Sequence, residues 1–153
     1  MKMGKIREIF AKCMGVLVAG MFSMGVSAQA QLPGAPRYLH ALSDLRAARA
    51  YIVADPRPQN GNERDHEIHE IQEAIKEIKK AAIDDGKDVD FVPPPDAQGM
   101  AAGPLHEAVR LLRNAHDDCF GAEDMPQAIG MKMRALRHID EARDTLLRYM
   151  QGQ

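Results

Sequence analysis

Residues 68–82, IHEIQEAIKEIKKAA, decide the fold class of this chain. Isoleucine stands at positions 68, 71, 75 and 78, and Ala82 continues the same spacing of three and four residues. Side chains with this spacing lie on one face of an α-helix, and the glutamates and lysines between them lie on the other. The stretch therefore predicts an amphipathic helix from about Glu63 to Asp85, closed by Gly86 as its C-terminal cap.

Three further segments show the same periodicity, and prolines or glycines stand at or near their ends. We expect helices from about Tyr38 to Ala54, from Pro104 to Phe120 and from Pro126 to Met150, with Asp124 as a cap of the last. Their apolar faces comprise Tyr38, Ala41, Leu42, Leu45, Ala48 and Ile52; Leu105, Ala108, Val109, Leu112, Ala115 and Cys119; and Ile129, Met133, Leu136, Ile139, Leu146 and Met150. Four amphipathic helices without a strand pattern predict an all-α, antiparallel four-helix bundle.

The connections differ in length. Residues 55–62 and 121–125 are short and each join antiparallel neighbours, whereas residues 86–103 form a long linker rich in proline and glycine. We expect this linker to cross the end of the bundle with Phe91 and Val92 as apolar anchors.

The two halves of the chain share short sequence matches. Leu-His occurs at 39–40 and at 105–106, and Ile-x-Glu-Ala occurs at 71–74 and at 139–142. A duplicated helical hairpin explains these matches and places the long linker between the two copies. Coincidence between helices of similar composition explains them as well.

The N-terminal segment has the pattern of a secretory signal peptide. Four basic residues in positions 2–12 precede an apolar run from Cys13 to Val26, and the small residues Ala28 and Ala30 follow. We expect residues 1–30 to be removed, leaving residues 31–153 as a periplasmic or secreted domain without stable membrane insertion. An uncleaved membrane anchor is the alternative interpretation, but the run is shorter than the about 20 residues of a typical span.

Several stretches of the mature part resemble a group of small exported bacterial helical proteins without an assigned function. The resemblance rests on residues 38–49 (YLHALSDLRAAR), 81–87 (AAIDDGK), 103–108 (GPLHEA) and 137–143 (RHIDEAR). It implies export and a helical domain, and it supplies no catalytic or binding residues.

Composition narrows the possible partners. The chain has a formal net charge of −2, no tryptophan and only 5% aromatic residues, and removal of the basic signal segment makes the remainder more acidic. Nucleic-acid binders carry basic stripes, often with stacking aromatics, so we exclude that class. Cys119 is the only cysteine after residue 30. A lone thiol is either buried or paired with another chain, and its position on an apolar helix face favours burial.

Histidines are the candidate metal ligands. His66 and His69 stand one helical turn apart, and Glu63 and Glu70 can add oxygen ligands for a transition metal. A polar, solvated first helical turn is the alternative interpretation.

A b-type haem is a second metal hypothesis. It would be held between Met133 and either His116 or His40. Methionine as core filler is the alternative interpretation.

Two arginines fall on or near apolar helix faces and need partners. We expect buried ion pairs of Arg49 with Asp44 and of Arg143 with Asp140.

The sequence contains no glycine-rich phosphate loop, nucleophile elbow or His-Glu-x-x-His motif, so we expect no enzymatic activity and no cofactor. The sequence therefore predicts an exported, non-catalytic helical protein of the bacterial envelope that binds or scaffolds a protein or another envelope component. A periplasmic protein that binds a metal or haem is the alternative.

Overall fold

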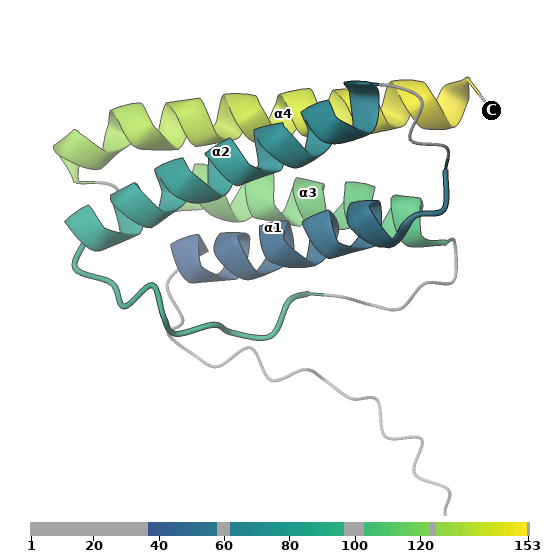
Figure 1. Cartoon of the computed structure of the whole chain (residues 1–153). Helices are drawn as coiled ribbons and strands as arrows, with labels where there is room; N and C mark the ends of the chain where they lie inside the picture. The colour runs from purple at the N-terminus through teal and green to yellow at the C-terminus, as the bar shows by residue number, and fades with distance from the viewer. Residues whose placement is uncertain (1–36, 58–61, 97–102, 123–124, 153) are drawn as a thin grey trace, which may run out of the picture. The chain divides into compact units, whose positions relative to one another are not determined.

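The computed structural model describes residues 37–57, 62–96, 103–122 and 125–152. These residues form four long α-helices and one short 3-10 helix, and they contain no strand. The elements are α1 (Arg37–Ala54), α2 (Asn62–Asp84), α3 (Pro104–Gly121), η1 (Pro126–Ala128) and α4 (Ile129–Gln151) (Figure 1). The all-α class and the four helices are confirmed, and only the 3-10 start of the last segment differs in type. The predicted signal segment 1–30 and the predicted cap Asp124 lie outside the described residues.

The helix ends follow their sequence signals. Gly86 adopts a positive φ of 69° after α2, and Lys87 donates its backbone N–H to the carbonyl of Ala82. Pro104 is the first residue of α3, where a missing N–H costs no helical hydrogen bond. No helix among the described residues combines the length and the apolar character that a membrane crossing needs.

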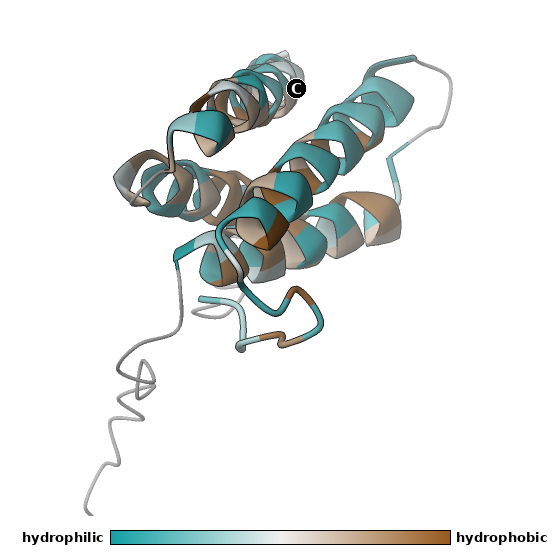
Figure 2. Cartoon of the chain, turned by 90° about the vertical axis from the view of Figure 1, so that its left-hand side faces the viewer, coloured by the Kyte–Doolittle hydropathy of each residue, from teal (hydrophilic) through white to brown (hydrophobic). Residues whose placement is uncertain are grey.

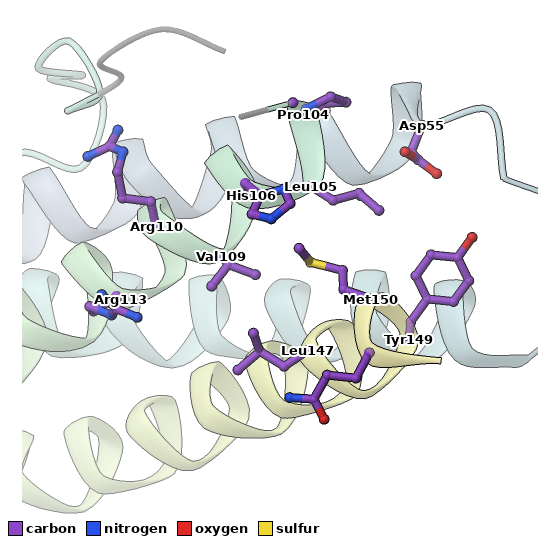
Figure 3. Close-up of a pocket in the computed structure, with 12 residues that line it drawn as sticks. Asp55, Pro104, Leu105, His106, Val109, Arg110, Arg113, Leu147, Tyr149 and Met150 are labelled. Carbon is purple, nitrogen blue, oxygen red and sulfur yellow. The ribbon is translucent and has the colours of Figure 1, made fainter. Parts of the chain in front are cut away.

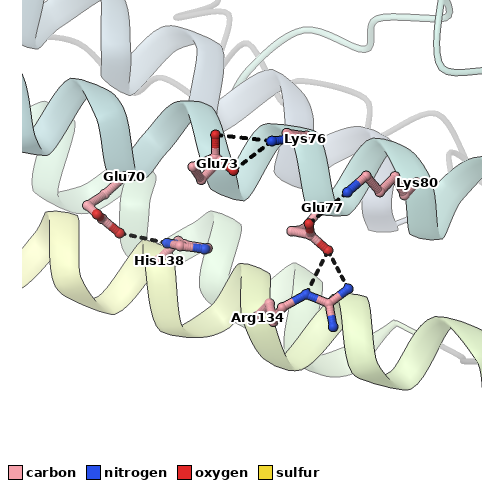
Figure 4. Close-up of polar contacts among 7 residues, drawn as sticks. All are labelled: Glu70, Glu73, Lys76, Glu77, Lys80, Arg134 and His138. Carbon is pink, nitrogen blue, oxygen red and sulfur yellow. Dashed lines mark hydrogen bonds and ion pairs between the residues drawn. The ribbon is translucent and has the colours of Figure 1, made fainter.

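Each helix carries both hydrophobic and hydrophilic residues (Figure 2), and the helices pack in two main pairs. Helix α2 has its largest interface with α4, and α1 has its largest interface with α3. Glu70 contacts His138 and Glu77 contacts Arg134, so α2 and α4 run in opposite directions (Figure 4). Arg37 at the start of α1 donates to the carbonyl of Gly121 at the end of α3.

The direction of α2 and α3 corrects one prediction about the linker. These two helices run the same way (Figure 1), so the chain between them returns along the bundle instead of crossing its end. The described part of the linker lies against α1, where Ser43 Oγ donates to the Pro93 carbonyl at 2.5 Å. Phe91 and Val92 are 45% and 53% exposed and do not anchor it. Hydrogen bonds between α1 side chains and the linker backbone hold this segment, and the two apolar side chains do not.

The core is built on alanine pairs seven residues apart, one pair in each helix. The eight residues are fully buried: Ala41 and Ala48, Ala74 and Ala81, Ala108 and Ala115, and Ala135 and Ala142. Positions seven apart lie on the same helix face, and small side chains there allow neighbouring helices to approach closely. Leucines, isoleucines and the buried Cys119 fill the remaining volume, as the sequence predicts for that cysteine.

The predicted apolar face of α4 is wrong at its beginning. Ile129 and Met133 are 48% and 58% exposed, because the buried line of this helix passes through Ala135, Ile139 and Leu146. The repeated Ile-x-Glu-Ala motif does lie in the core in both copies, since its isoleucines and alanines are all fully buried.

Acidic residues are not confined to the solvated faces, contrary to the sequence-based expectation. Glu67 of α2 is fully buried, and Arg57 contacts both of its carboxylate oxygens, one at 3.2 Å. Burial raises the pKa of Glu67, and the hydrogen bond from Arg57 opposes that rise. The guanidinium of Arg57 also lies 4.5 Å from the centre of the Tyr149 ring. This buried pair joins the first interhelical connection to the end of α4.

Enlarging an alanine of a buried pair tests the close approach of the helices. Ala74→Leu should lower the free energy of unfolding by about 1–3 kcal/mol, because the added carbons overpack the α2 interface. Ala50→Leu on the exposed face of α1 is the matched control and should change it by less than about 0.5 kcal/mol. Urea unfolding followed by circular dichroism measures both, and equal midpoints for the two variants would contradict close packing.

Candidate functional site

The predicted histidine–glutamate set does not come together as one metal site. His66 Nδ1 lies 3.7 Å from Glu70 Oε1, but the other oxygen of Glu70 lies 2.6 Å from Nδ1 of His138 on α4. His69 and Glu63 are exposed. Positions 63 and 69 face solvent, whereas 70 faces α4, so the α2–α4 packing brings Glu70 into an interhelical hydrogen bond with His138.

One of the two predicted arginine pairs is present, but it is not buried, since the side chains of Arg143 and Asp140 are 26% and 40% exposed. Arg143 Nη1 lies 3.0 Å from Asp140 Oδ1, an ion pair whose angles are not those of a hydrogen bond. The Arg49–Asp44 pair is wrong: within the described chain Asp44 accepts the backbone N–H of Asp96, and the buried Nε of Arg49 has no hydrogen-bond partner. The backbone of the linker is therefore the partner of Asp44, in place of the predicted Arg49. The sequence did not place the linker beside α1.

The residues considered for haem are not enclosed by the bundle. Met133 and His116 both line a surface depression of about 450 Å³ between α3 and α4. Met133 is 58% exposed, so it does not fill the core either. His40 belongs to α1 and does not line this depression.

A larger pocket lies between the beginning of α3 and the end of α4 (Figure 3). Its volume is about 740 Å³, within the range of small-molecule sites. Its apolar walls are Leu105 and Val109 of α3 and Leu147 and Met150 of α4. Sequence reasoning assigned three of these four side chains to the core, and the open end of the bundle exposes part of them to the pocket.

An arginine, a histidine and a helix N-terminus border this apolar floor. His106 and Arg113 line the pocket, and no described ion pair or hydrogen bond engages either side chain. The N-terminus of α3 also belongs to the pocket and has no side-chain cap, so its backbone N–H groups add a partial positive charge. Asp55 is the single carboxylate in the lining.

Arg110 connects the pocket with the linker. Its guanidinium is held by Glu107 in two hydrogen bonds of 3.0 and 2.7 Å, and it also donates to the carbonyl of Asp96. The N–H of Asp96 donates to Asp44 Oδ1 at 2.7 Å. This chain of contacts ties α1, the linker and α3 together beside the pocket.

Asp44 is the most perturbed acid of this network. Its pKa is raised from 3.8 to about 7, and burial is the main cause. The charges of Asp96 and Asp118 raise the pKa further, whereas the hydrogen bond from Asp96 and the charge of Arg110 lower it. Its side chain is 1% exposed, and sequence reasoning missed it as a linker contact. The presence of an aspartate among the buried positions of α1 is the signal that could have indicated a polar partner.

Comparison with known proteins gives no assignment, because no protein-family model, curated protein or solved structure matches the chain. The site must therefore be judged on its own geometry.

The raised pKa of Asp44 predicts a pH-dependent stability in metal-free buffer. Between pH about 4 and about 7 the folded state holds a proton that the unfolded chain has released, so the free energy of unfolding falls as the pH rises. One pKa unit corresponds to about 1.4 kcal/mol, so the total loss is a few kcal/mol.

Asp44→Asn should flatten this slope and be more stable than the wild type at pH 8, because the amide oxygen still accepts the Asp96 N–H. Urea unfolding in buffers that contain EDTA, at pH 4, 6 and 8, measures the free energy of unfolding of both proteins. Asp117→Asn, an exposed neighbour of the network, should keep the wild-type slope. Parallel slopes for Asp44→Asn and the wild type would show that Asp44 does not titrate in this interval.

Proposed function

We propose that this chain is an exported, non-catalytic binding protein of the bacterial envelope. Its ligand is a component with an apolar body and one acidic group, of the long-chain carboxylate type. The proposal rests on the pocket between α3 and α4.

The pocket favours such a ligand through two separate parts. Leu105, Val109 and Met150 provide an apolar surface that gains free energy when a hydrocarbon chain covers it. Arg113 and His106 stand at the same pocket without described partners, and the uncapped start of α3 adds N–H donors. An acid group beside Arg113 replaces water at a guanidinium that has no described internal counterion.

Other features support binding over catalysis and export over retention. The described lining residues include no serine, threonine or cysteine, and the hydroxyl group among them is that of Tyr149. The basic start, apolar run and small residues of segment 1–30 support export. The acidic surplus of the remaining chain supports a partner other than nucleic acid.

Calorimetric titration of residues 31–153 with dodecanoate tests the ligand class. We expect one saturable site, and we expect neutral dodecan-1-ol to bind more weakly. Arg113→Gln should weaken dodecanoate binding about tenfold, because a charge-assisted hydrogen bond contributes about 1.5–3 kcal/mol, while leaving dodecan-1-ol binding unchanged.

Arg137→Gln is the matched control, since Arg137 is another exposed arginine but lies on α4 outside this pocket. Leu105→Trp should weaken binding of both compounds by narrowing the pocket. Absence of saturable binding, or equal effects of Arg113→Gln and Arg137→Gln, would refute the proposed site.

A further inference from the structure

Three aspartates from three separate segments meet beside the linker. Asp44 belongs to α1, Asp96 to the linker and Asp118 to α3, and one carboxylate oxygen of each lies within 4.8 Å of the other two. Among the described residues, this is the only group of three or more histidine, cysteine or acidic side chains with such spacing. Three ionised carboxylates this close repel one another unless one of them is protonated or a positive charge lies between them.

The buried member of the group has an unused oxygen. Asp44 is 1% exposed; its Oδ1 accepts the N–H of Asp96, and its Oδ2 has no hydrogen-bond partner. A buried polar atom without a partner is rare in folded proteins and often marks a missing ion or water. This observation is independent of the spacing of the three acids and indicates a ligand on the same carboxylate.

The nearby side-chain cations act on the cluster through their charge, but none of those described donates a hydrogen bond to Asp44 Oδ2. Arg110 directs two hydrogen bonds to Glu107 and one to the carbonyl of Asp96. Arg37 donates to the carbonyl of Gly121 at 2.8 Å. Burial raises the pKa of Asp118, and the charges of His40 and Arg37 oppose that rise. None of these described contacts supplies a donor to Asp44 Oδ2.

We propose that Asp44, Asp96 and Asp118 bind a hard divalent cation of the calcium type. All three ligands are oxygens, which is the donor set of calcium and magnesium and not that of zinc or copper. Calcium accepts six to eight oxygens in flexible geometry, so water can complete the shell beside three carboxylates from independent segments. The bound ion ties the linker to both α1 and α3.

This site differs in place and chemistry from the histidine set on α2. A soft or borderline metal on His66 and His69 would leave the linker untouched, whereas a cation on Asp96 restrains it. The inference is also independent of the proposed ligand pocket, so each can fail without the other.

The test is calcium titration by calorimetry of EDTA-treated residues 31–153, with the same titration for two neighbouring variants. The wild type and Asp117→Asn should bind one Ca²⁺, and Asp118→Asn should bind it at least tenfold more weakly. Asp117 is the matched control because its side chain is 74% exposed and lies outside the cluster. Both substitutions are isosteric, and circular dichroism checks that both variants keep their helices.

Hydrogen exchange locates the effect. Ca²⁺ should slow amide exchange in residues 89–96 of the wild type and of Asp117→Asn, but not in Asp118→Asn. The proposal is overturned if neither Ca²⁺ nor Mg²⁺ binds saturably at millimolar concentration, or if Asp118→Asn binds as tightly as Asp117→Asn. Binding that leaves exchange in 89–96 unchanged would likewise overturn it, as would a Zn²⁺ preference that His66→Ala removes.

Discussion

The attachment of the linker to α1 is the constraint on which the rest of the arrangement depends. Two side chains of α1 that are buried, Ser43 and Asp44, bind the backbone of Pro93 and Asp96. A chain that leaves α2 and enters α3 in the same direction must travel back along the bundle, and its polar backbone needs partners on the way. The contacts with Ser43 and Asp44 provide these partners. They also place Asp96 beside Arg110 and Asp118 of α3.

The helices could be predicted from sequence because their signals are local. The isoleucine spacing of α2, the Gly86 cap and Pro104 at the start of α3 each act within a few residues, and the structure places all of them as expected. Two of the four buried alanine pairs, Ala41 with Ala48 and Ala108 with Ala115, lie on the predicted apolar faces, whereas the pairs of α2 and α4 were not among the predicted core residues. What periodicity does not reveal is which helix each face meets.

The site could not be predicted because it depends on those pairings. Leu105 and Val109 have the spacing of core residues, and only the open end of the bundle turns them toward a pocket. Glu70 and His138 are far apart in sequence and meet across α2 and α4, which gives Glu70 a second partner besides His66. Asp44 is a polar residue on a buried helix face. Its partner is the backbone N–H of Asp96, 52 residues away in the sequence, which no local pattern indicates.

The pairing of α1 with α3 and of α2 with α4 also determines how the chain reaches its fold. The contacts that join these pairs connect residues 84 positions apart, for Arg37 and Gly121, and 68 apart, for Glu70 and His138. Such closures cost chain entropy before any interface forms, and contacts of long sequence separation slow folding. The hairpin of α1 and α2 is therefore synthesised well before the surfaces that cover most of it. We therefore expect the bundle to fold only after α3 and α4, which provide the largest interfaces of α1 and α2, have been synthesised.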